Sequence, residues 1–119
     1  MLKNIPAILS PELLKTLCEM GHSDRIIIAD GNFHAESMGK NCKVIRADGH
    51  GVPELLDAIL TLFPLDTYVE KPVNLMQVMP GDTAKTPIWD EYKAIVAKHD
   101  ERGNNAIGQI ERFDFYGQA

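Results

Sequence analysis

Two short runs of apolar residues, each closed by an Asp-Gly pair, alternate along this chain with segments of helical periodicity. Residues 25–29 (Arg-Ile-Ile-Ile-Ala) precede Asp30, and residues 43–47 (Lys-Val-Ile-Arg-Ala) precede Asp48. Runs rich in Ile and Val that end at such turn pairs are typical of buried strands. In α/β sheets, ligands bind just past the carboxyl ends of strands. Both aspartates are therefore candidate ligand-binding residues.

Apolar residues repeat at helical spacing in three other segments. Ser10 can cap the first helix, because its hydroxyl can accept from the free amides of the first turn, and Pro11 suits the first helical position. In this helix Leu13, Leu14, Leu17 and Cys18 are expected on the core face. The first predicted helix starts at Pro11 and stops before Gly21, and two more are predicted at residues 52–63 and 88–98. Further strands are predicted at residues 72–79 and 107–116.

The order strand–helix–strand recurs along the chain, which predicts an α/β fold with a largely parallel or mixed sheet. We expect three layers, α/β/α, around a mixed, mostly parallel sheet. The length of 119 residues predicts a single domain, residues 1–119.

The formal net charge of −5 argues against a nucleic-acid partner, since phosphate binding needs a basic surface. It also provides no attraction to anionic membranes. The most apolar helix, residues 52–63, carries Glu54 and Asp57 and is too short to cross a bilayer. The first residues lack the apolar stretch of a signal peptide. Cys18 and Cys42 form no C-x-x-C pair, so we expect a reduced cytoplasmic protein with structural cysteines.

The segment Gly-His-Ser-Asp, residues 21–24, places His22 between a helix and a predicted strand. A histidine ordinarily titrates near pH 6.5 and can carry a proton in either direction, as general acid–base catalysis requires. The alternative is that His22 only caps the preceding helix, where its charge favours the helix dipole. The sequence leaves both interpretations open.

The other polar candidates also have structural alternatives. Asp30 can accept hydrogen bonds from the hydroxyls of a ligand or bond its own backbone in a turn, and for Asp48 the turn is favoured. Arg46 and Arg112 can each form a structural ion pair with a carboxylate. The four histidines have no metal-ligand spacing, and no dinucleotide or phosphate-binding loop is present, so neither metal nor cofactor is expected.

The chain resembles the L-fucose mutarotase/D-ribose pyranase family collinearly over nearly its whole length. The Gly-His-x-Asp motif with His22 and the Ile-Arg-Ala-Asp-Gly motif with Asp48 are specific in combination. The Arg-Ala-Asp-Gly and Arg-Phe-x-Phe-Tyr segments favour the fucose branch. The similar segments are residues 9–14, 19–24, 27–30, 37–39, 44–49, 65–68 and 111–116.

The resemblance implies that His22 is the catalytic residue and that Asp30 and Arg112 bind the substrate. Members of the family interconvert the α and β anomers of a free monosaccharide without a cofactor, and they assemble as rings, commonly decamers. We therefore expect L-fucose as substrate and a homodecamer, with no membrane partner. The alternatives are a D-ribose pyranase-type mutarotase and a non-catalytic sugar-binding protein. Relatives also continue past Tyr116 with a further helix, a strand and a Tyr-Gly-Asn motif, which we expect this chain to lack.

The spacing of His22 and Asp30 adds an expectation about the site. An extended link of eight residues spans roughly 26 Å at about 3.3 Å per residue, much more than a hexose. Either the chain curls back near Ser23 and Asp24, or His22 meets Asp30 of a neighbouring subunit. We favour the second arrangement, which predicts a site at a subunit interface.

Overall fold

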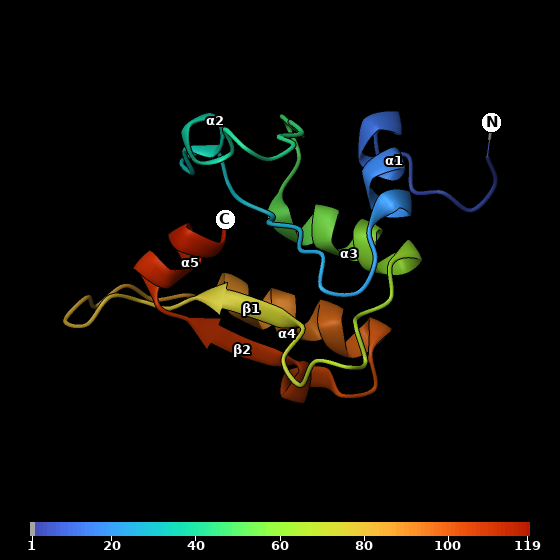
Figure 1. Ribbon diagram of the computed structural model, residues 1–119. Helices are drawn as coiled ribbons and strands as arrows, with labels where there is room; N and C mark the ends of the chain where they lie inside the picture. The colour runs from blue at the N-terminus through green and yellow to red at the C-terminus, as the bar shows by residue number, and fades with distance from the viewer. Residues whose placement is uncertain (1) are drawn as a thin grey trace. The chain divides into compact units, whose positions relative to one another are not determined.

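A computed structural model describes residues 2–119. The chain divides into two units, the first ending at Pro64 and the second beginning at Leu65. The first unit contains the helices α1 (Pro11–Glu19), α2 (Ala35–Met38) and α3 (Val52–Leu62) (Figure 1). The second contains β1 (Val73–Met76), α4 (Ile88–His99), the short 3-10 helix η1 (Gly103–Ala106), β2 (Ile107–Ile110) and α5 (Arg112–Gln118).

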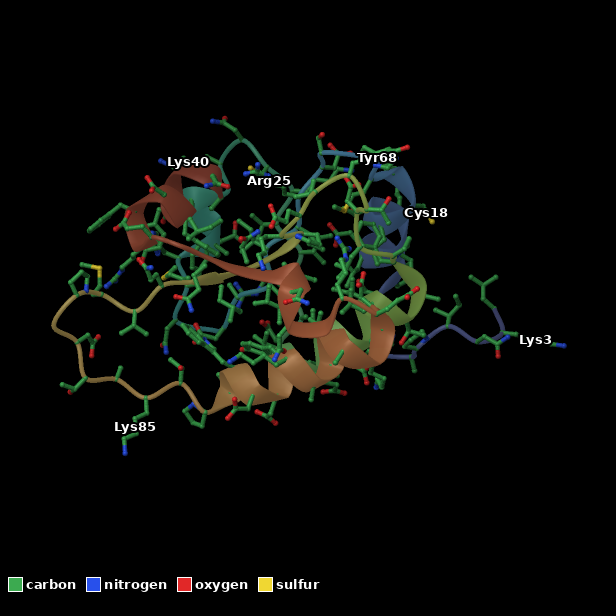
Figure 2. All side chains as sticks on the ribbon, turned by 90° about the horizontal axis from the view of Figure 1, so that it is seen from below. Lys3, Cys18, Arg25, Lys40, Tyr68 and Lys85 are labelled. Carbon is green, nitrogen blue, oxygen red and sulfur yellow. The ribbon has the colours of Figure 1, made fainter. Side chains whose placement is uncertain are left out.

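Helix α1 begins where the sequence predicts it to begin. The Ser10 hydroxyl accepts a hydrogen bond from the Leu13 amide at 3.1 Å. Leu13 and Leu17 are buried, as predicted, but Cys18 is exposed. Cys18 follows Leu17 by about 100° around the helix, which turns it off the buried face. Cys18 and Cys42 are both exposed free thiols, so the expectation of structural cysteines is wrong (Figure 2 labels Cys18).

The core of the first unit is built where α1 and α3 contribute their apolar faces. Pro53 lies in the first turn of α3, as predicted, and the helix ends one residue before Phe63. Burying a leucine or isoleucine stabilises a fold by about 1.5–3 kcal/mol, so this cluster is the main stabilising feature of the unit. Its buried members are Leu9, Leu13, Leu17, Leu55, Ala58 and Ile59.

The strands predicted at residues 25–29 and 43–47 do not form. Within residues 2–119 only β1 and β2 are strands, and Figure 1 shows coil between α1 and α2. Ile26 and Ile28 nevertheless pack against the core while Ile27 is exposed, so the side chains alternate as in a strand. A strand also needs a partner backbone, and no such pairing joins the two segments. The sequence pattern therefore predicted correctly that apolar side chains of these segments are buried, and wrongly that their backbones pair in a sheet.

A strand–helix–strand arrangement organises the second unit. Strands β1 and β2 pair in parallel, with Val73 opposite Ile107 and Met76 opposite Ile110. Helix α4 joins them and runs alongside the sheet (Figure 1). The predicted α/β fold with parallel strands is thus confirmed, with a small sheet.

The strand predicted at residues 107–116 ends early. Strand β2 stops at Ile110, because the Glu111 carboxylate accepts hydrogen bonds from the amides of Phe113 and Asp114 at 3.0 and 3.1 Å. Such a carboxylate satisfies free amides at a helix start and favours the positive end of the helix dipole. Arg112 is consequently the first residue of α5 and does not lie in a strand, which corrects the sequence-based placement.

Val96 should be the most sensitive core position of α4, because its side chain is fully buried. Val96→Ala removes two methyl groups and leaves a cavity, which should lower the free energy of unfolding by about 2 kcal/mol. Urea denaturation measures this loss. Val69→Ala, at a residue that is 43% exposed, is the control and should change stability by less than about 0.5 kcal/mol. Equal effects of both variants would contradict the assigned core.

Arg102 ties the segment before β1 to the end of α4. Its guanidinium donates to both carboxylate oxygens of Asp100, at 3.0 Å each. It also donates to the backbone carbonyls of Val69 and Asp66, at 3.0 and 3.3 Å. The hydrogen bonds from the Arg102 side chain, and then from its backbone amide, lower the pKa of the Asp100 carboxyl below its usual value.

This ion pair predicts a pH dependence of stability. Because the folded state lowers the pKa of Asp100, the carboxylate stabilises the fold above its unfolded pKa of 3.8. That stability is lost as the pH falls below this value. We expect Asp100→Asn to melt below the unchanged protein at pH 7, with a gap that narrows towards pH 2 in thermal melts. Asp90→Asn, on the exposed face of α4, is the control; a gap for Asp100→Asn that does not depend on pH would reject the ion pair.

Within residues 2–119, no helix has both the length and the apolar character that a bilayer crossing requires.

Candidate functional site

His22 lies in a tight turn just after α1. The Asp24 amide donates to the Gly21 carbonyl at 3.2 Å, and the Asp24 carboxylate accepts from the Gly21 amide at 2.8 Å. Ser23 has φ of 73°, in the left-handed region, where the chain changes direction. His22 is exposed. A proton-transfer residue must be accessible to its substrate, and the position of His22 satisfies this requirement.

Asp30 lies in a second turn of the same unit. Its carboxylate accepts from the Asn32 amide at 3.0 Å, and its carbonyl accepts from the Phe33 amide at 3.2 Å. The turn interpretation of Asp30 is therefore confirmed. This bond fixes one carboxylate oxygen on an exposed residue, so the turn holds the acidic group in place at the surface. Residues 25–29 separate this turn from the turn that contains His22.

Arg112 belongs to the second unit and contacts Tyr116. Its Nε atom donates to the tyrosine hydroxyl at 2.9 Å, and its guanidinium lies 5.6 Å from the centre of the tyrosine ring. The two residues are one helical turn apart, which brings them together on α5. In a strand the same spacing would separate them by about 13 Å. The hydrogen bond therefore depends on the helix that Glu111 starts.

A shallow hollow of about 260 Å³ lies in the second unit beside Arg112 and Tyr116. Its wall continues along the residues that follow β1, through the loop where Figure 2 labels Lys85, to the first turn of α4. In that loop, Gly81 adopts φ of 83°, and the Asp82 amide donates to the Met79 carbonyl at 3.0 Å. This hydrogen bond closes a tight turn. The lining residues are Met76, Gln77, Val78, Met79, Asp82, Ala84, Thr86, Trp89, Arg112 and Tyr116.

The remaining candidates behave as structural residues. Arg46 donates to both oxygens of the Asp48 carboxylate, at distances of 3.1 to 3.3 Å, so the predicted ion pair is confirmed for this arginine. Arg112 instead bonds a tyrosine. Within residues 2–119, no three His, Cys, Asp or Glu side chains gather as metal ligands would.

Sequence reasoning missed the part that Trp89 plays in the hollow. The helical spacing of Trp89, Tyr92, Ile95 and Val96 predicts that Trp89 lies on the core face of α4. Trp89 is half-buried there, but its side chain also lines the hollow. Periodicity identifies the buried face of a helix and says nothing about which part of that face borders a cavity. The Met-Pro-Gly-Asp turn signal before α4 could have indicated that a loop leaves one end of this face uncovered.

The fold and these residues define a small α/β protein with a shallow hollow whose lining mixes polar and apolar side chains. The model of the RbsD/FucU transport protein family matches residues 3–119. The chain belongs to the RbsD/FucU family.

Individual relatives are similar in sequence to this chain over most of their own length. The human fucose mutarotase is 48% identical over 122 residues, which cover 99% of this chain and 78% of the human protein. The crystal structure of FucU from Bifidobacterium longum is 65% identical with a TM-score of 0.93, over 96% of this chain and 80% of that one. The fucose mutarotase of Streptococcus pneumoniae, solved in complex with L-fucose, is 44% identical with a TM-score of 0.87, over 98% of this chain and 81% of that one.

Proposed function

We propose that this protein is an L-fucose mutarotase, an isomerase that interconverts the α and β anomers of the free sugar. One observation carries the proposal: the chain is 44% identical, over 98% of its length, to a fucose mutarotase solved in complex with L-fucose. The human relative of the same name agrees with this assignment. The ribose alternative has no comparable support among these relatives.

Mutarotation opens the sugar ring and closes it on the other face of C1. Opening requires a proton at the ring oxygen and the removal of the proton from the anomeric hydroxyl. The C1–O5 bond then breaks as the carbonyl forms, and the reverse steps close the ring. We propose that His22 transfers these protons, since an exposed imidazole can act as acid and as base.

Asp30 and Arg112 are proposed to bind the sugar hydroxyls. The Asp30 carboxylate is already oriented by the Asn32 amide, and the Arg112 guanidinium by the Tyr116 hydroxyl. Side chains held by neighbours lose little conformational freedom on binding. Accurate positioning matters because small displacements lower rates steeply.

The experiment that tests the function is saturation-transfer NMR on the anomeric protons of L-fucose. Adding the protein should raise the exchange rate between anomers well above the uncatalysed rate, and D-ribose under the same conditions should respond less. An unchanged rate for L-fucose would reject the proposal, and sugar-induced stabilisation without exchange would point to a binding protein.

The finer arrangement is also a proposal: a three-layer α/β/α subunit assembled in a ring of ten, in the cytoplasm, with His22 meeting Asp30 of a neighbouring subunit. The shared site follows from the ring assembly that the family resemblance implies, and the turn at Ser23 is equally compatible with one subunit holding both residues. Two exposed thiols suit a reducing compartment. Mixing a His22→Ala protein with an Asp30→Ala protein should restore part of the exchange if subunits reassemble. Mixed oligomers without activity would reject the shared site.

A further inference from the structure

The hollow in the second unit is lined by both polar and apolar side chains. Arg112 and Tyr116, together with Gln77, Asp82 and Thr86, supply hydrogen-bonding groups, while Val78, Met79 and Trp89 supply apolar surface. These three apolar residues are half-buried, so part of their surface remains available to a ligand. We call Val78, Met79 and Trp89 the apolar wall.

The hydrogen bond between Arg112 and Tyr116 determines which groups a ligand can meet. The Nε hydrogen of Arg112 is directed to the tyrosine oxygen at 2.9 Å. The Nη hydrogens are then the donors that a ligand hydroxyl can reach. A molecule that contacts both kinds of surface must therefore carry hydrogen-bond acceptors, such as hydroxyl oxygens, together with a hydrocarbon group.

L-Fucose has this distribution of groups, because C5 of its ring carries a methyl group where a common hexose carries a hydroxymethyl group. We propose that the apolar wall binds this methyl group and thereby selects a 6-deoxy sugar, while Arg112 holds ring hydroxyls. This inference rests on the proposed function and names the part of the substrate that the hollow recognises. The volume of about 260 Å³ lies below the range for drug-sized ligands, and a monosaccharide is smaller than those ligands.

Chemistry offers a matched ligand for the test. D-Arabinose in its pyranose form has the same hydroxyl configuration as L-fucose and lacks only the methyl group. One methyl or methylene group in an apolar pocket changes specificity by about 10- to 200-fold. Because the hollow is open on one side, we expect the lower end, about tenfold in favour of L-fucose.

Trp89 provides a direct readout, since it is the one tryptophan of the chain. Titrating the protein with each sugar and following its fluorescence measures binding at the hollow without reference to catalysis. The expected result is a change in emission with both sugars and a Kd about tenfold lower for L-fucose. Equal Kd values, or emission that neither sugar changes, would overturn the inference.

Variants of the wall locate the effect. Met79→Thr and Val78→Thr place a hydroxyl on the wall and leave Trp89 as reporter, and each should reduce the preference to less than about threefold. Val78→Thr nearly keeps the side-chain volume, so it remains informative if Met79→Thr does not fold. Ile88→Ala, next to Trp89 in the chain but outside the hollow, is the matched control and should keep the full preference. A full preference in both folded wall variants would contradict the proposal.

The same sugars separate this inference from the function on which it rests. Accelerated anomer exchange that is equal for L-fucose and D-arabinose would support a mutarotase and reject methyl recognition. A tenfold binding preference without faster exchange would reject the mutarotase and support methyl recognition.

Discussion

Replacing His22 with alanine should lower the exchange rate of L-fucose anomers by about 10²–10⁴-fold, the usual contribution of a positioned acid–base group. The fold should survive, because His22 is exposed in a turn that is closed by hydrogen bonds between Gly21 and Asp24. Saturation-transfer NMR measures the rate, and circular dichroism with a thermal melt verifies the fold.

A control and a rescue make the His22 experiment specific. His50 is another histidine of the first unit, and its imidazole lies 3.5 Å from the Glu54 carboxylate. His50→Ala should leave the exchange rate unchanged. Added imidazole should restore part of the rate to His22→Ala, since it can supply the missing proton carrier. Unchanged exchange in a folded His22→Ala protein would falsify the assigned catalyst.

Replacing Arg112 with alanine should raise the KM for L-fucose by about 10- to 100-fold, because a hydrogen bond from a charged donor contributes about 1.5–3 kcal/mol. The effect should appear in KM more than in kcat if Arg112 binds hydroxyls that do not react. Exchange rates measured over a range of sugar concentrations separate the two quantities. Trp89 fluorescence gives an independent Kd.

The controls for Arg112 come from the chain itself. Arg46→Ala removes an exposed arginine whose guanidinium is occupied by Asp48, and it should leave KM unchanged. Tyr116→Phe removes only the hydroxyl that accepts from Arg112 and should raise KM by a few-fold. An unaltered KM in Arg112→Ala would exclude this arginine from sugar binding.

Periodicity predicted α1, α3 and α4 because their signals are local, but it missed the short helices α2 and α5. Ser10 and Pro11 mark the start of α1, and the apolar residues of α3 and α4 repeat at helical spacing as predicted. Strand predictions at residues 25–29 and 43–47 failed because a strand requires a partner elsewhere in the chain. The alternating burial of Ile26, Ile27 and Ile28 shows that local pattern reports only which side chains are covered.

The sequence was sufficient to name the candidate site residues, but not to predict which side chains contact them. Resemblance indicated His22, Asp30 and Arg112, and the roles of these three residues remain predictions. Local sequence offered the Asp30 turn as one of two interpretations, since an aspartate can bond its own backbone two residues on. The contact between Arg112 and Tyr116 could not be predicted from a strand assignment. It required Glu111 to be recognised as the residue that caps the start of α5.

The position of Glu111 has a consequence for affinity. One residue separates the paired backbone of β2 from Arg112, so the arginine is attached almost directly to the sheet. Its main chain has little freedom to forfeit when a sugar arrives, and the tyrosine already restrains its side chain. Most of the entropy that an exposed arginine usually loses on binding is therefore lost during folding, which leaves more of each new hydrogen bond as net binding free energy.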